Sequence, residues 1–463
     1  METLKKRYGL ITAICMVVGI VIGSGVFFKA QNVLNKTGGD ALDGILAWII
    51  GGAIMVVLSS TFAIMATKHE KVNGVVDYAE AICGKGYAYY IAWFVTYIYY
   101  PAMTSVLAWV SARYTLIAIF GVEKDGEMIF STECILLAVF YLAAIYFINA
   151  ISPKLAGKFQ VTTTVAKLVP LVLIALVGTV IGLVNGNLSS NFEIGEAISA
   201  AIPDGAGTGL FPAICATAFA YEGWIIATAI NAEIKDAKKN LPLALLIGSA
   251  IIVAIYVLYY IGVLGLENTG VLMAQGTHAA FQKFGTVGAT IINFLVVISC
   301  LGTLNGLMLG CTRGAYTLAA RNEGIKPKTF AQIDKETNVP HNSAALALLV
   351  CAIWLVYFVG ANGLNWFGEY GFDSSELPII TIYPLYVPIL IGFMIQEKGM
   401  HPFKRFVLPI LSIVGSGIMV VASILSHGMD NVYYLAIFVP VMAIGAYFQF
   451  KNKKEAVEIP AEE

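Results

Sequence analysis

Residues 18–27 read VGIVIGSGVF and lie in the middle of an apolar run, 8–34, that is long enough to cross a bilayer. A membrane-spanning helix needs about 20 consecutive apolar residues. Gly23, Ser24 and Gly25 weaken this helix at mid-membrane depth, because a glycine costs about 1 kcal/mol relative to alanine. If the helix opens there, its second half presents free N–H groups and a positive dipole end, which is typical of a carboxylate site. Close packing of these small residues against another helix explains the segment alone equally well.

Apolar runs of similar length recur along the whole chain. Hydrophobic residues make up 58% and charged residues 12% of the 463 positions, whereas a soluble domain carries about 25% charged residues. Since a bilayer accepts no lipid-exposed irregular backbone, each run is expected to be helical. The sequence therefore predicts an all-α integral membrane protein with twelve transmembrane helices in a lipid bilayer. The expected spans are 8–34, 43–67, 86–119, 129–149, 155–183, 207–232, 241–265, 286–313, 342–360, 374–395, 405–426 and 431–450.

The sixth span carries a second sign of a break. FAYEGW, residues 219–224, stands in its middle, and a glutamate at this depth is a functional candidate because burying its charge is costly. Breaks in the first and sixth spans predict a five-plus-five inverted repeat whose discontinuous helices 1 and 6 meet at a substrate site. One break would offer N–H groups to an anion and the other carbonyls to a cation, so a zwitterion is the natural ligand. Residues 1–463 would then form one transporter domain, with repeats at 8–183 and 207–395 and two additional helices at 405–450.

Lysines within the spans allow two interpretations. Lys167 lies in the fifth span, more than a turn beyond the basic residues that precede it. It is either a snorkelling side chain near the interface or an internal ammonium that holds helices together where an ion would otherwise bind. Lys29 lies toward the outer end of the first span, and we interpret it as snorkelling.

The eighth span carries a row of glycines at a strict four-residue interval. Such a row faces one side of a helix and lets a neighbouring helix approach closely. We expect this helix to pack against the first, mobile one. The row consists of Gly302, Gly306, Gly310 and Gly314.

Basic residues gather in the loops on one side of the expected membrane. Cytoplasmic loops are rich in lysine and arginine, so we expect both termini in the cytoplasm and the protein as a multi-pass component of the cell membrane. The loops 184–206, 361–376 and 427–431 contain neither residue type. A net charge of −1 excludes the basic footprint of a nucleic-acid-binding protein.

Catalytic signatures are missing from the sequence. No HExxH, GxSxG or P-loop motif occurs, although such motifs mark many hydrolases and nucleotide-binding enzymes. The seven cysteines lack metal-ligand or disulfide spacing and are interpreted as small apolar residues. The five histidines lie in loops or at span ends, so none is predicted to be a buried proton carrier. We expect neither an enzyme nor a cofactor or metal.

Several segments in order resemble one known family. The chain is similar to the L-type amino-acid transporter branch of the amino acid–polyamine–organocation superfamily, and the likeness covers nearly all of residues 8–450. Taken alone, the Gly23-Ser24-Gly25 tripeptide is a weak signal, but the full set in order is specific. The matching segments are Ile22–Phe27, Phe219–Trp224, Glu233–Pro242, Ser299–Gly306, and Gln160 together with Ala166 and Lys167.

The resemblance implies roles for individual positions. Backbone N–H groups of Ser24 and Gly25 would bind the substrate carboxylate. Phe219 would close over the substrate as a gate, and Lys167 would place its ammonium where sodium-coupled relatives hold a sodium ion. Carbonyls of Ile22, Phe219, Ala220 and Glu222 would receive the α-ammonium. The expected substrate-binding set is therefore Ile22, Gly23, Ser24, Gly25, Phe219, Ala220 and Glu222.

Two departures from the family pattern bear on function. Animal relatives carry a cysteine between the third and fourth spans that binds a glycoprotein subunit, but residues 121–133 contain none, so no heavy-chain partner is expected. Position 222 is glycine or serine in many relatives, and a glutamate there must be paired with an internal group or with a cationic substrate. The resemblance implies sodium-independent exchange of small neutral amino acids. Proton-coupled amino-acid uptake and cationic amino acid/amine antiport are the alternatives.

Overall fold

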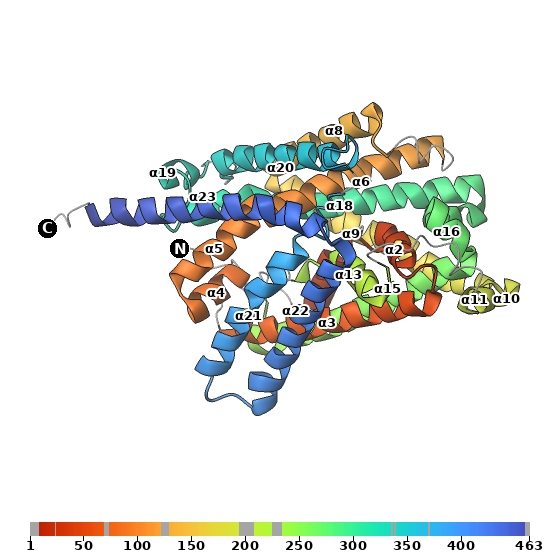
Figure 1. Ribbon diagram of the computed structural model, residues 1–463, viewed down its shortest axis with the longest axis horizontal. Helices are drawn as coiled ribbons and strands as arrows, with labels where there is room; N and C mark the ends of the chain where they lie inside the picture. The colour runs from red at the N-terminus through yellow and green to blue at the C-terminus, as the bar shows by residue number, and fades with distance from the viewer. Residues whose placement is uncertain are drawn as a thin grey trace.

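The regular elements in the described part of the protein are helices. The structure, a computed structural model, describes residues 9–23, 25–68, 74–121, 129–193, 208–224, 234–334, 337, 339–368 and 371–458. Within these ranges, ten helical segments are long and apolar enough to span a membrane. Most of them run along the long axis of the molecule, whereas α21 and α22 are inclined to it (Figure 1).

The long segments follow the expected spans closely, and three of them contain a π-helical turn. They are α3 (Ala41–Lys68), α5–η1–α6 (Lys85–Phe94, Val95–Tyr99, Tyr100–Phe120), α8 (Thr132–Ile151), α9–η3–α10 (Pro153–Leu173, Ile174–Gly178, Thr179–Asn185), α15 (Ala237–Leu266), α18 (Gly285–Ala319), α20 (His341–Asn362), α21 (Ile379–Gln396), η6–α22 (Phe403–Val407, Leu408–His427) and α23 (Asp430–Glu458).

Shorter helices complete the described part of the chain. Three of them, α1, α2 and α13, lie within the first and sixth expected spans, and the others lie in the connections. The shorter elements are α1 (Leu10–Val21), α2 (Gly25–Lys36), α4 (Val75–Cys83), α11 (Asn187–Phe192), α13 (Leu210–Tyr221), α16 (Thr269–Gln275), α17 (His278–Phe281), η5 (Gln282–Phe284) and α19 (Pro327–Phe330).

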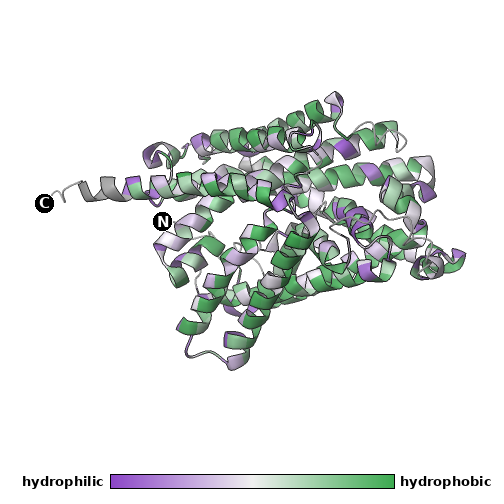
Figure 2. Ribbon diagram, viewed as in Figure 1, coloured by the Kyte–Doolittle hydropathy of each residue, from purple (hydrophilic) through white to green (hydrophobic). Residues whose placement is uncertain are grey.

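The outer surface of the bundle is apolar. Large hydrophobic side chains such as Leu136, Phe140, Val161 and Leu183 are exposed, and apolar residues cover the outward faces of the long helices (Figure 2). A soluble monomer rarely exposes extended apolar surface, and such surface marks contact with a membrane or a partner. Together with the ten long apolar helices, it makes this chain a multi-pass membrane protein.

Both predicted breaks lie at the glycine-containing segments. The helix α1 ends at Val21, Ile22 is extended (φ −63°, ψ 107°), and α2 begins at Gly25. The helix α13 ends at Tyr221, and the next residue, Glu222, is also extended (φ −67°, ψ 160°). These interruptions leave backbone N–H and carbonyl groups without partners inside a helix.

The two breaks touch one another through their backbones. A Cβ atom added to Gly25 would lie 2.6 Å from the Ala220 Cα atom, so only glycine fits at this crossing. A Cβ atom on Gly23 would lie 2.7 Å from the Thr303 Oγ1 atom of α18. The glycines therefore allow α13 and α18 to approach the interruption between α1 and α2.

The glycine row of α18 allows close packing against neighbouring helices, as expected. Added Cβ atoms along the row would meet Thr163 and Gln160 of α9, and Tyr100 and Thr96 of the α5–η1–α6 segment. The expectation that this helix lies against the first span is confirmed at a residue outside the row, because Thr303 abuts the α1–α2 break. The row itself packs against α9 and the α5–η1–α6 segment.

Candidate functional site

A cavity of about 360 Å³ lies where the interrupted helices meet. This volume is within the usual range for sites that hold small molecules. Its walls come from α1, α2, η1, α6, α9, α13 and α18. Residues of the two breaks that line it are Gly23, Gly25, Phe219, Ala220, Glu222 and Gly223, and other lining residues include Met16, Tyr99, Gln160, Thr303, Asn305 and Arg313.

Most of the predicted substrate-binding residues are thus gathered at one cavity. Gly23 and Gly25 come from the first break, while Phe219, Ala220 and Glu222 come from the second. Ile22 is buried beside them but is not among the lining residues. Ser24 lies outside the described residues.

The α2 helix begins beside this cavity. Its first residues have N–H groups without partners inside the helix, and its dipole places partial positive charge at this end. The helices α1 and α13 end close to it, and the carbonyl ends of helices carry partial negative charge. The cavity therefore combines a donor-rich wall with an acceptor-rich wall.

Tyr256 of α15 ties the two breaks together. Its buried hydroxyl lies 3.3 Å from the Val21 carbonyl oxygen and 3.0 Å from the Ala220 carbonyl oxygen, and it donates toward both. One side chain thereby fixes the last carbonyls of α1 and α13 relative to each other. Sequence reasoning missed Tyr256, because it stands in a run of apolar and aromatic residues without a motif of its own.

Lys167 is buried next to the first break. Its side chain is 1% exposed, and its Nζ atom donates a hydrogen bond of 2.7 Å to the Gly19 carbonyl oxygen. Gly19 stands in the last turn of α1, where the negative end of the helix dipole favours a cation. This burial excludes the interpretation of Lys167 as a snorkelling side chain.

Glu222 has polar neighbours inside the bundle. The Tyr99 hydroxyl and the Gly223 backbone both interact favourably with its carboxylate. Tyr99 ends the π-helical turn η1, and such turns occur frequently at functional sites because they redirect side chains. The sequence predicted that Glu222 needs a partner but could not identify Tyr99.

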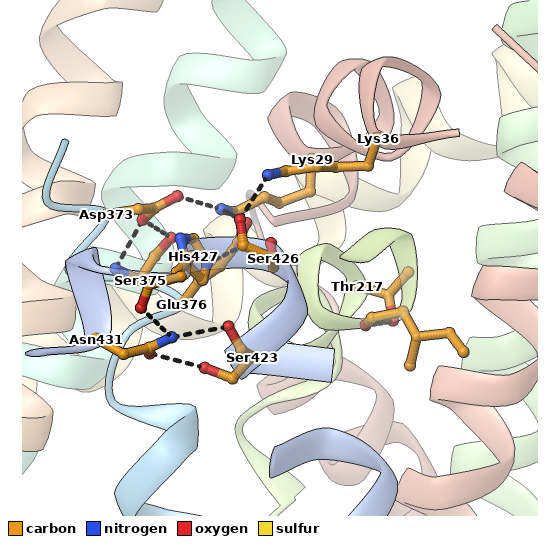
Figure 3. A network of polar contacts seen from close by, with 12 residues as sticks. Lys29, Lys36, Thr217, Asp373, Ser375, Glu376, Ser423, Ser426, His427 and Asn431 are labelled. Carbon is orange, nitrogen blue, oxygen red and sulfur yellow. Dashed lines mark hydrogen bonds and ion pairs between the residues drawn. The ribbon is translucent and has the colours of Figure 1, made fainter. Parts of the chain in front are cut away.

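Charged residues of α2, of the segment before α21 and of α22 form a network of polar contacts (Figure 3). The Lys29 side chain is 0% exposed, and its Nζ atom binds the Asp373 carboxylate at 2.8 Å and also the Glu376 carboxylate. Glu376 additionally pairs with the His427 ring nitrogen at 2.9 Å. We call Lys29, Asp373, Glu376 and His427 the charge cluster. The interpretation of Lys29 as a snorkelling side chain is wrong, and His427, although it ends a helix as expected, joins a buried network.

The charge cluster lies directly over the aromatic residues of the breaks. The Lys29 Nζ atom is 5.9 Å from the centre of the Phe219 ring, and Phe219 packs edge-on against Phe28 with 5.3 Å between ring centres. In the other direction, the cavity continues along α1 to Met16 and along α9 to Gln160. The cavity is therefore covered at its α2 end and extends toward the α1 end.

A membrane-embedded helical bundle in which interrupted helices converge on a central cavity is the architecture of secondary transporters. The family model described as amino acid permease matches residues 8–447. The chain belongs to this family. It is a bacterial-type member that resembles the L-type branch, and it is a transporter rather than an enzyme.

Individual relatives support this placement. The chain is 28% identical to the serine/threonine exchanger SteT of Bacillus subtilis, over 97% of this chain and 98% of the relative. It is 26% identical to the human large neutral amino acids transporter small subunit 2, over 97% of this chain and 82% of that relative. The crystal structure of MhsT in complex with L-phenylalanine matches with a TM-score of 0.57 at 13% identity, over 95% of this chain and 100% of that chain, and shows the shared fold.

Proposed function

We propose that this protein is a sodium-independent exchanger of small neutral amino acids that works by alternating access in the cell membrane. The observation that carries the proposal is the convergence of both helix breaks on one cavity, with the Lys167 ammonium bonded to Gly19 beside it. Similarity to a bacterial serine/threonine exchanger along nearly the whole chain supports exchange of amino acids of this size.

In this proposal, the chain crosses the membrane twelve times. The ten long helices are joined by the interrupted first and sixth spans, each of which begins one repeat (8–183 and 207–395), and helices at 405–450 follow. Lysines and arginines in the loops on one side place both termini in the cytoplasm by the positive-inside rule. The α2 end of the cavity then faces outward. With no cysteine in 121–133, the transporter works without a heavy-chain glycoprotein.

The substrate is held as a zwitterion between the two breaks. N–H groups of Ser24 and Gly25 bind its carboxylate, because the start of α2 carries positive dipole charge. The α-ammonium of the substrate donates hydrogen bonds to backbone carbonyls of the break residues, which are Ile22, Phe219, Ala220 and Glu222. The Phe219 ring covers the substrate and separates it from the charge cluster above.

Lys167 replaces a coupling ion. Its ammonium is held by the Gly19 carbonyl and supplies a fixed positive charge beside the first break, so no sodium ion is required there. A charge that stays on the protein dissipates no ion gradient. Net uptake is therefore slow, whereas exchange of one amino acid for another is fast.

Glu222 limits the size of the substrate side chain. Its carboxylate already has a partner in the Tyr99 hydroxyl, so it does not need a cationic substrate for pairing. It also occupies volume in the cavity that a glycine would leave open. Both points favour small neutral substrates over arginine, ornithine or diamines.

Replacing Glu222 by glycine should widen the substrate range. In proteoliposomes that exchange labelled L-serine, we expect leucine and phenylalanine to compete at least about tenfold better against Glu222→Gly than against wild type, which is the scale of discrimination set by pocket size. Glu222→Gln keeps the volume without the charge, so it should continue to exclude both large amino acids. The measurement is a competition panel of the twenty amino acids and several diamines.

The same panel decides between the proposal and its main rival. If arginine or a diamine is the best competitor of L-serine exchange by the wild-type protein, and Glu222→Gln removes that preference, the Glu222 carboxylate selects substrates by their positive charge. The protein would then be a cationic amino acid/amine antiporter, a function that a carboxylate lining the cavity would serve. Poor competition by every cation contradicts that rival.

A further inference from the structure

Two members of the charge cluster, Glu376 and His427, meet a third metal-ligand side chain, that of Cys215. Cys215 comes from α13, Glu376 from the segment that leads into α21, and His427 from the end of α22. A sulfur, a carboxylate oxygen and a ring nitrogen of these residues all lie within 4.8 Å of one another, and Cys215 and Glu376 are buried. The three residues are far apart in the sequence, so the fold alone brings their ligand atoms together.

This combination of atoms suits a borderline-soft divalent metal. Zinc binds thiolate, imidazole and carboxylate ligands at about 2.0–2.3 Å in tetrahedral sites, and thiolate ligands exclude hard cations such as magnesium. We propose that Cys215, Glu376 and His427 form a binding site for zinc or cadmium at the closed end of the cavity. None of the three residues lines the substrate cavity, and none was among the substrate-binding residues predicted from the sequence.

The geometry needs only local adjustment to admit the metal. The His427 Nε2 atom and the Glu376 Oε2 atom are hydrogen-bonded at 2.9 Å, whereas two ligands of tetrahedral zinc lie about 3.4 Å apart at the usual bond lengths. The metal takes the place of the proton between these two atoms, and the neutral imidazole carries its proton on Nδ1 instead. The Cys215 sulfur lies at most 4.8 Å from a ring nitrogen of His427 and a carboxylate oxygen of Glu376 and moves closer to the metal, and the thiol releases its proton to solvent as the metal–sulfur bond forms.

Neighbouring groups orient the ligands. The Lys29 ammonium holds the other carboxylate oxygen, Oε1, of Glu376, and groups outside the ligand shell that fix a ligand in this way strengthen metal sites. Ser426 is 6% exposed and its hydroxyl has no hydrogen-bond partner among the described residues. It lies beside His427 and Glu376 (Figure 3), where its oxygen or a water completes the coordination.

The charges of the surroundings favour a divalent cation. Two ammonium groups, of Lys29 and Lys36, stand against three carboxylates, of Asp373, Glu376 and Asp430. With a neutral imidazole the region carries one net negative charge, and loss of the thiol proton adds a second. A divalent cation balances both. The Asp373 side chain is 31% exposed, so a metal ion could reach the site from solvent past this carboxylate.

Metal binding would hold the transporter closed at this end. The ligands come from α13, from the segment before α21 and from α22, so one ion would cross-link the helix that carries Phe219 to two other elements. This consequence rests on the proposed exchange function, whereas the site itself does not. Zinc or cadmium would therefore inhibit exchange by stabilising the covered state.

Cadmium binding to the purified full-length protein in detergent tests the site without reference to transport. We expect the ultraviolet charge-transfer absorption of a cadmium–thiolate bond to rise with one cadmium per chain. Cys215→Ser should abolish the absorption, and His427→Gln should weaken binding at least tenfold. Cys351→Ser is the matched control, since its sulfur lies 3.8 Å from that of Cys311 in a second buried pair, and it should leave the titration unchanged.

The outcomes separate the site from the function. An absorption that survives in Cys215→Ser, disappears in Cys351→Ser, or never appears in wild type overturns the metal site. If cadmium binds as expected but wild-type exchange proceeds at its usual rate with the metal bound, the closing effect is overturned. Failure of wild type to exchange any amino acid contradicts the proposed function, while the binding titration still decides the site.

Discussion

Lys167→Ala should reduce amino-acid exchange to the background of empty liposomes. Alanine leaves the Gly19 carbonyl without its 2.7 Å hydrogen bond and removes the positive charge beside the first break. An unsatisfied buried group costs about 1–3 kcal/mol, which corresponds to roughly a fivefold to hundredfold change in the population of the competent arrangement. Exchange of labelled L-serine, normalised to monodisperse protein recovered by size-exclusion chromatography, measures the effect.

A second lysine on the same helix provides the control for this variant. Lys158 also belongs to α9 but is exposed, so Lys158→Ala should exchange at the wild-type rate. Wild-type exchange by Lys167→Ala would show that its ammonium is not needed beside the break. Loss of monodisperse protein in Lys167→Ala alone would instead assign the lysine to folding.

Lys29→Met should destabilise the protein strongly and impair exchange. The substitution keeps the length of the side chain but leaves the Asp373 and Glu376 carboxylates without their buried ammonium. Removing one partner of a buried ion pair costs about 3–5 kcal/mol, because the remaining charge is uncompensated. Thermal unfolding of the purified protein should therefore occur several degrees lower, and the exchange rate should fall with it.

Further variants separate the lost ion pair from other effects of Lys29→Met. Adding Glu376→Gln should recover part of the stability, since it removes one of the uncompensated charges. Lys36→Met should lower the unfolding temperature less than Lys29→Met. Lys36 donates to the uncharged Ser426 carbonyl at 3.2 Å, so its removal leaves no carboxylate of that bond uncompensated. Phe219→Ala should slow exchange much more than it reduces the amount of folded protein, because its ring is expected to cover the substrate. Equal stability of Lys29→Met and wild type would contradict a structural role for the charge cluster.

The breaks could be predicted because local sequence determines them. Glycines within an apolar run and a glutamate at mid-membrane depth each conflict with an ordinary spanning helix. The structure places the ends of α1 and α13 at these segments, with Gly25 against Ala220. Their shared cavity followed from the spacing of the breaks and from the resemblance to transporters.

Contacts between distant segments could not be predicted in the same way. Lys29 lies 344 residues before Asp373 and 347 before Glu376, and a single sequence gives no sign of such a pairing. Without that pairing, a lysine near the end of a span is best interpreted as snorkelling. Tyr256 and Tyr99 were missed for a related reason, since aromatic residues are common in this chain and only the fold shows which hydroxyls reach the breaks.

The glycine row shows a further limit of sequence reasoning. Regular spacing identifies a face on which helices pack closely, but it does not name the neighbour. In the structure that neighbour is α9 together with the α5–η1–α6 segment. Cys215 is a similar case, because an apolar span explains its burial and only the fold brings it near Glu376 and His427.

Sodium-independent exchange is tested most directly by the entry of labelled L-serine into proteoliposomes that are either empty or loaded with unlabelled L-serine. We expect entry into loaded vesicles to be several-fold faster, and to be unchanged when choline replaces sodium on both sides. Equal entry into empty and loaded vesicles, a several-fold loss without sodium, or acceleration by an inward proton gradient alone would contradict the account.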